Sequence, residues 1–283
     1  MSNINRGGGL FAGANPYLGG AGDVTQQFFR ERSPSLKYQV RMLPAEIQDV
    51  LEKPLSWFEE DATRQPEPGE EMLTQVGFVL DKSSSMSVGK TVTIAGFNEQ
   101  LGRVREGAEQ VVGATQMTFT QFSHEVAVCY AGASLDVVQP LTVETYCPGG
   151  STALFDGIGD TLAALLSLPR INSAACATLV TIFTDGEENC SVRYSAAMLQ
   201  DLIKKLEATK RWTFALIGPK RGVDSLASLL SVAKSNVTGF EPHSVESRNA
   251  VMGAIAQASS SYMTTRSMGA SQVFGLYDQG NKS

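Results

Sequence analysis

Three polar segments of the sequence carry oxygen donors of the kind that bind a hard cation. The first holds Asp81, Ser83 and Ser85, the second holds Thr152, and the third holds Asp185. Both aspartates come directly after apolar runs of the type that forms buried strands. Carboxylate and hydroxyl oxygens without a neighbouring thiol or imidazole suit Mg²⁺, Mn²⁺ or Ca²⁺ rather than zinc or copper. These residues are therefore candidates for a metal centre.

The elements that must position these residues follow from the hydrophobic pattern. Apolar runs predict strands over 74–81, 178–184, 212–217 and 237–240, and two β-rich runs with a very short connection predict an antiparallel pair over 117–122 and 126–130. Between them, apolar residues recur at helical spacing, as in Ile94, Phe97, Leu101 and Val104. This alternation predicts an α/β fold, with a doubly wound, mostly parallel sheet, one antiparallel edge strand and helices on both faces.

In such a sheet the carboxyl ends of the strands share one edge, where ligands bind, so we expect the three polar segments to meet there. Asp81-x-Ser83-x-Ser85, followed by Thr152 and then by Asp185 in Thr-Asp-Gly, resembles the metal-ion-dependent adhesion site of von Willebrand factor A (vWA) domains. All five positions match in residue type and order. The flanking sequences look like those of intracellular bacterial members of the family.

The resemblance implies a complete adhesion site that holds Mg²⁺ or Mn²⁺, with Ca²⁺ less favoured. Ser83, Ser85 and Thr152 would bind through their hydroxyls, and Asp81 and Asp185 would supply charge directly or through water. A carboxylate of a partner protein would fill the open coordination position. This is binding chemistry, so we expect an interaction module and no enzyme. Intracellular bacterial relatives often work beside a MoxR-like AAA+ ATPase, and an adaptor role beside such a partner follows from the resemblance alone.

Three alternatives fit parts of the sequence. Asp81, Ser83 and Thr152 could simply cap helices. Ser84 to Thr91 reads S-S-M-S-V-G-K-T, which matches a phosphate-binding loop and hence a nucleotide-binding enzyme, except that Ser84 stands where the loop needs glycine. The Gly-rich N-terminal arm with its aromatic residues, together with aromatic residues near the C-terminus, could instead join copies of the chain into a larger assembly.

Composition and hydrophobic pattern divide the 283-residue chain into three parts. Residues 1–72 are expected to form a flexible Gly-rich arm, one short helix within 34–58 and an acidic linker over 59–71. Residues 73–265 carry the resemblance to a vWA domain, and 266–283 are expected to form a C-terminal tail. No internal repeat is visible.

Composition excludes several classes of protein. The net charge of −6 provides no basic surface for nucleic acid. No apolar run is long enough to cross a membrane, and the first residues lack the apolar stretch of a secretory signal. The four cysteines contain no C-x-x-C pair, which indicates free thiols rather than a zinc or redox motif. We therefore expect a cytoplasmic protein.

Overall fold

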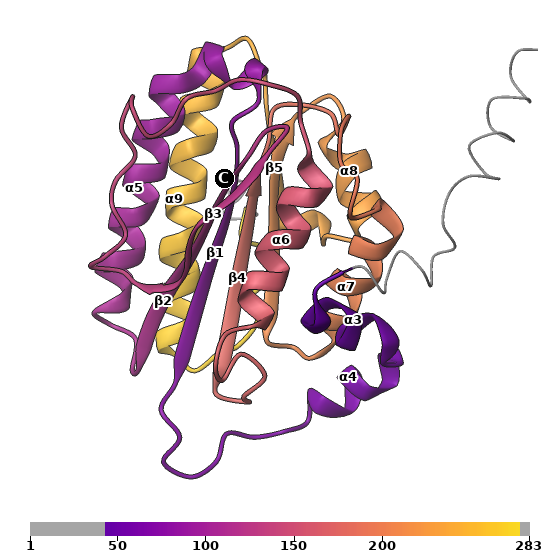
Figure 1. Cartoon of the computed structure of the whole chain (residues 1–283). Helices are drawn as coiled ribbons and strands as arrows, with labels where there is room; N and C mark the ends of the chain where they lie inside the picture. The colour runs from indigo at the N-terminus through magenta and orange to yellow at the C-terminus, as the bar shows by residue number, and fades with distance from the viewer. Residues whose placement is uncertain (1–42, 278–283) are drawn as a thin grey trace, which may run out of the picture. The chain divides into compact units, whose positions relative to one another are not determined.

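A six-stranded sheet forms the centre of the computed structural model, which describes residues 43–277 (Figure 1). The strands are β1 (Leu73–Asp81), β2 (Ala114–Phe122), β3 (Val126–Ser134), β4 (Cys176–Phe183), β5 (Trp212–Pro219) and β6 (Val237–Phe240). They lie in the order β3-β2-β1-β4-β5-β6, and every neighbouring pair is parallel except β2 with β3. The predicted α/β fold with one antiparallel edge strand is confirmed.

Helices cover both faces of this sheet (Figure 1). One face carries α5 (Lys90–Ala108) and α9 (Val245–Ser267), and the other carries α6 (Leu154–Leu166), α7 (Ala196–Ala208) and α8 (Val223–Leu230). Central strand β1 is buried along its whole length and alternates between the two faces. Phe78 packs with Phe97 of α5, whereas a Cβ added to Gly77 would lie 3.2 Å from Leu165 of α6.

The short helix predicted within 34–58 forms, but a second helix that the apolar spacing did not predict follows it. Residues 34–42 lie outside the described part of the chain, and the rest form two helices, α3 (Ala45–Glu52) and α4 (Leu55–Asp61). Lys53 between them is extended, with φ −75° and ψ 142°, because the ring of Pro54 disfavours a helical residue before it. Pro54 also lacks the N–H that a continuous helix would need.

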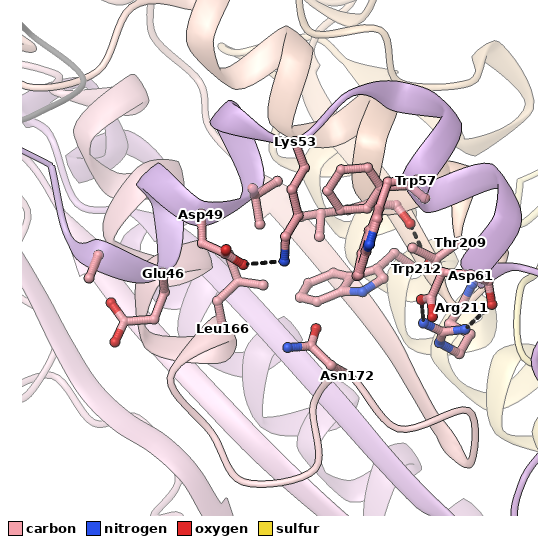
Figure 2. A pocket seen from close by; sticks show the side chains of 14 residues that line it. Glu46, Asp49, Lys53, Trp57, Asp61, Leu166, Asn172, Thr209, Arg211 and Trp212 are labelled. Carbon is pink, nitrogen blue, oxygen red and sulfur yellow. Dashed lines mark hydrogen bonds and ion pairs between the residues drawn. The ribbon is translucent and has the colours of Figure 1, made fainter. Parts of the chain in front are cut away.

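Helices α3 and α4 pack against α6 and α7 and border a cavity of about 280 Å³ near the start of β5 (Figure 2). Four of the charged side chains around it form ion pairs with one another. Asp61 is buried and forms an ion pair with Arg211. Lys53 lies 2.7 Å from Asp49 and 4.2 Å from the Trp57 ring centre. The expected acidic linker therefore begins with residues that belong to α4 and to the core.

After α9 the chain returns to the sheet. Gln272 Nε2 donates to the carbonyl of Trp212 at 2.7 Å, and the N–H of Leu276 donates to Asn236 Oδ1 at 3.2 Å. The described part of the expected tail therefore contacts the domain. Across residues 43–277, none of the helices has the length and apolar character of a membrane span.

One acid of α7 makes the stability of the fold depend on pH. Burial raises the pKa of Glu207 to about 7, from an ordinary value of 4.5. Ionisation therefore costs more in the folded state, and Glu207 lowers the stability progressively as the pH rises from 4.5 to about 7. We expect Glu207→Gln to raise the Tm by a few °C at about pH 8 and to change it little near pH 4.5, measured by thermal melts.

Glu60→Gln provides the control, because Glu60 is exposed on α4. Its Tm should follow that of the wild type at every pH. A Glu207→Gln effect of equal size at pH 4.5 and pH 8 would contradict the electrostatic explanation.

Candidate metal centre

The carboxyl ends of β1 and β4 bring two of the polar segments into contact. The two strands are parallel and in register along eight residue pairs, so the residues that follow them share one edge of the sheet. There Thr184 Oγ1 donates to Asp81 Oδ2 at 2.6 Å, and Ser85 Oγ donates to Asp185 Oδ1 at 2.5 Å. Residues about one hundred positions apart thus share one site.

The loop that carries Thr152 completes the cluster. The N–H and the hydroxyl of Ser84 both donate to the carbonyl of Gly150 at 3.0 Å, which ties this loop to the first segment. A Cβ added to Gly186 would lie 3.1 Å from Thr152 Oγ1 and 3.5 Å from Ser85 Oγ, so both hydroxyls flank this glycine. The structure therefore gathers all five predicted residues at one edge of the sheet.

The hydroxyl and carboxylate oxygens of the site lie close to one another. Ser83 Oγ lies 3.1 Å from Ser85 Oγ, which lies 2.5 Å from Asp185 Oδ1. Adjacent ligands of an octahedral Mg²⁺ with bonds of about 2.1 Å are about 3 Å apart, which the Ser83–Ser85 distance matches, whereas Ser85 would have to give up its hydrogen bond to Asp185 and move slightly away from it. Within residues 43–277 no cluster of three or more His, Cys, Asp or Glu side chains is arranged for a metal. A cation here would depend on hydroxyl oxygens and two carboxylates.

Asp81 contributes buried charge. Its side chain is inaccessible to solvent, and its Oδ1 accepts from the N–H of Ser83 at 2.6 Å. Burial raises the pKa of Asp81 to about 6, the nearby Asp185 charge adds to this, and the hydrogen bonds from Thr184 and Ser83 oppose it. Tyr146 donates its hydroxyl to the Asp81 carbonyl at 2.6 Å. Both carboxylate oxygens of Asp81 therefore already hold the loops around the site.

Sequence reasoning missed two residues that hold this site. Arg248, in the first turns of α9, donates from Nη2 to Asp185 Oδ2 at 2.9 Å, and both side chains are 2% exposed. Asn189 accepts from the N–H of Thr152 at 2.9 Å and donates its own N–H to the Thr152 carbonyl at 3.0 Å. Neither belongs to the polar segments that drew attention, so spacing alone gave no signal for them.

Two further acids near the site bind backbone rather than solvent. Asp156 accepts from the N–H groups of three consecutive residues, Val192, Arg193 and Tyr194. Glu188 accepts from the N–H groups of Phe155, Cys190 and Ser191. Both carboxylates hold the loop after β4 in place, so we do not assign them to the metal.

The alternative phosphate-binding loop does not form. Ser84–Gly89 is a 3₁₀ helix, and Lys90 begins α5 with its Nζ donating to the carbonyl of Val143 at 2.7 Å. A phosphate-binding loop instead wraps its backbone N–H groups around the phosphates and extends its lysine toward them.

An open cavity of about 900 Å³ lies beside Asp185 and Gly186, at the ends of β5 and β6 and along α8. Apolar side chains form much of its wall, including Leu154, Phe155 and Leu226. Arg221, Glu187 and Glu241 are among the charged residues that line it. The loop with Asp185 and Gly186 therefore borders a cavity that has both apolar and charged walls.

Comparison with known proteins identifies a fold and no sequence relative. No family model matches the sequence, and no curated protein matches it. Among solved structures, proximal thread matrix protein 1 from the mussel byssus, in a form with a zinc-occupied MIDAS motif, is 16% identical with a TM-score of 0.46. That match covers 66% of this chain and 48% of the mussel chain, so this chain spans less than half of that structure.

Two bacterial pilus proteins have comparably low sequence identity and similar TM-scores. The pilus adhesin SpaC of Lactobacillus rhamnosus GG is 9% identical with a TM-score of 0.50, and the match covers 70% of this chain and 32% of SpaC. The vWF domain of the pili tip protein Mfa5 from Porphyromonas gingivalis is 11% identical with a TM-score of 0.47, over 71% of this chain and 97% of that domain. Identities this low show the fold alone, which in the described part of this chain is an α/β fold with a six-stranded, mostly parallel sheet.

Proposed function

We propose that this protein is a metal-dependent binding module. In the proposal Ser83, Ser85, Thr152 and Asp185 hold Mg²⁺ or Mn²⁺, and the buried charge of Asp81 supports them. An Asp or Glu side chain of a partner protein completes the coordination. The observation that carries the proposal is the convergence of the hydroxyl and carboxylate oxygens of Ser83, Ser85 and Asp185, from two separate strand ends, at one edge of the sheet.

The donor set explains why such a cation would bind a carboxylate. Hydroxyls are neutral, so the two aspartates supply all the negative charge among the five residues, and a further anionic oxygen can take a coordination position that these residues leave open. Ser85 is exposed whereas Ser83, Thr152 and Asp185 are buried, which leaves the site open on one side. The cavity beside Gly186 has room for residues that flank the partner's carboxylate.

The proposal extends to binding and not to catalysis. The oxygen ligands and their charge account for holding a cation and an anion, and we assign no reaction to them. Nothing in the fold or the site supports a MoxR-like ATPase in particular, so the partner is defined here by its carboxylate. A cytoplasmic location remains a proposal that rests on the sequence.

We expect Mn²⁺ and Mg²⁺ to bind the wild type saturably with one site in calorimetry. Because one side of the site is open, bound Mn²⁺ should keep exchanging water and increase the relaxation rate of water protons. Acetate, as a mimic of the partner's carboxylate, should displace that water and lower the relaxation rate. The double variant Asp81→Ala with Ser83→Ala should lose metal binding, since it removes one charge and one ligand.

Acetamide is the matched neutral control and should leave the relaxation rate of the Mn²⁺ complex unchanged. Absence of metal binding in the folded wild type would overturn the proposal. Equal metal affinity in the wild type and in the double variant would place the cation elsewhere.

Gly186→Ala tests the narrow space between the hydroxyls. The added methyl group would lie 3.1 Å from Thr152 Oγ1, so Thr152 must move by a few tenths of an ångström. We expect Mn²⁺ affinity to fall by about 10-fold, as for other residues that orient metal ligands. Calorimetry measures the affinity, and thermal melts check that the domain remains folded.

The control is Gly102→Ala in α5, where the added methyl group meets no atom within 4 Å. It should leave Mn²⁺ affinity unchanged and stabilise the helix by about 0.5–1 kcal/mol. Equal affinities for Gly186→Ala and the wild type would show that Thr152 does not contact the cation.

A further inference from the structure

We infer that Arg248 controls the charge and orientation of the metal centre from inside the protein. It positions Asp185, and its positive charge weakens the binding of the cation while strengthening the attraction of the occupied site for an anion. This inference deepens the proposed function and rests on it.

Arg248 is buried within a set of specific contacts. It is 1% exposed, and besides Asp185 it donates from Nη2 to the carbonyl of Pro242 at 3.2 Å. Its guanidinium carbon lies 4.8 Å from the centre of the Phe240 ring, and Nη1 lies 3.5 Å from Met86 Sδ. Phe240 stacks on Phe183, the last residue of β4, at 5.4 Å between ring centres. The Arg248 side chain thus extends from α9 to Phe240 at the end of β6 and to Asp185 just after β4.

The backbone at Gly89 packs directly against the Arg248 side chain. A Cβ added to Gly89 would lie 2.3 Å from both Cδ and Nε of Arg248, so only glycine leaves room for it. Arg248 also lies near the N-terminus of α9, which begins at Val245, where the helix dipole disfavours a cation. The carboxylate of Asp185 offsets this disadvantage. A packing role alone would not require a charged group at this place.

The contact decides which oxygen of Asp185 faces the metal. Oδ2 accepts from Arg248, whereas Oδ1 accepts from Ser85 at the hydroxyl cluster. With Oδ2 held by the guanidinium, Oδ1 is the oxygen that remains for a cation. Asp185 can therefore act as a single-oxygen ligand and does not need to turn when the cation arrives.

The charge of Arg248 changes what the site attracts. Asp81 and Asp185 with Arg248 leave one net negative charge, which a divalent cation converts into one net positive charge. Without Arg248 the occupied site would be neutral. Because charges interact strongly in a buried site, the arginine lowers cation affinity and gives the occupied site a net attraction for a carboxylate.

The test compares two neutral variants with the wild type. Arg248→Gln keeps a hydrogen-bond donor, and Arg248→Met keeps the apolar stem against Phe240, so the test does not depend on the folding of one variant. We expect both to bind Mn²⁺ about 10-fold more tightly in calorimetry. In water proton relaxation, both should need about 10-fold more acetate to displace the water on bound Mn²⁺. A merely structural role would not move the two affinities in opposite directions.

Two variants control for charge and for damage to α9. Arg248→Lys keeps the positive charge and should change the Mn²⁺ affinity by less than about threefold. Arg266→Gln removes another buried arginine of the same helix, which donates to Thr74 Oγ1 and to the carbonyls of Leu73 and Ala175, at the other end of the sheet. It should lower the Tm and leave both affinities unchanged.

The outcomes separate this inference from the proposed function. If the wild type binds Mn²⁺ and both neutral variants bind it equally or more weakly, the inference is overturned and the binding module stands. If only the neutral variants bind Mn²⁺, the inference is supported and metal-dependent binding by the wild type fails. If neither the wild type nor any variant binds Mn²⁺, both the inference and the proposed function are overturned.

Discussion

The parallel pairing of β1 with β4 is the constraint on which the site depends. Because the two strands are parallel and in register, Asp81 and Asp185, about a hundred residues apart, lie at the same edge of the sheet. The hydrogen bond from Thr184 to Asp81 closes this edge, and the loop with Thr152 is tied to it through Gly150. Shifting this register by one residue would turn the side chains to the opposite faces and separate the two carboxylates.

Two buried carboxylates at this edge repel each other, and the protein neutralises only one of the two negative charges. Asp81 is fully buried, and its raised pKa shows that ionisation is disfavoured there. Asp185 is neutralised by Arg248 from the opposite side. One net negative charge remains next to neutral hydroxyls, and a divalent cation would satisfy it. A bound cation and Arg248 would together neutralise the two aspartates.

Close approach of backbone to these groups explains why glycine stands at three places. Gly186 leaves space between the hydroxyls of Thr152 and Ser85, and Gly89 leaves space for Arg248. Gly150 has φ +80°, and a Cβ there would lie 2.1 Å from His124 Nδ1. The similarity to solved structures concerns the fold, whereas these local requirements concern which groups fit in the site. The functional argument therefore rests on the site and not on the fold.

Sequence patterns were sufficient to predict the α/β fold and the residues at the carboxyl edge of the sheet. Buried strands such as the one predicted over 178–184 are mostly apolar, and polar residues that follow such strands lie at the edge of the sheet. The break at Pro54 was also present in the sequence, although apolar spacing alone suggested one helix.

The groups that complete the site come from elements that are brought together by folding. Arg248 follows Asp185 by 63 residues in a different element, and the return of residues 272–277 to the sheet depends on contacts with β5 and Asn236. Sequence patterns report the local period of helices and strands, and they identify the face that becomes buried. They do not report which buried polar side chain meets which, because that depends on how distant elements pack together.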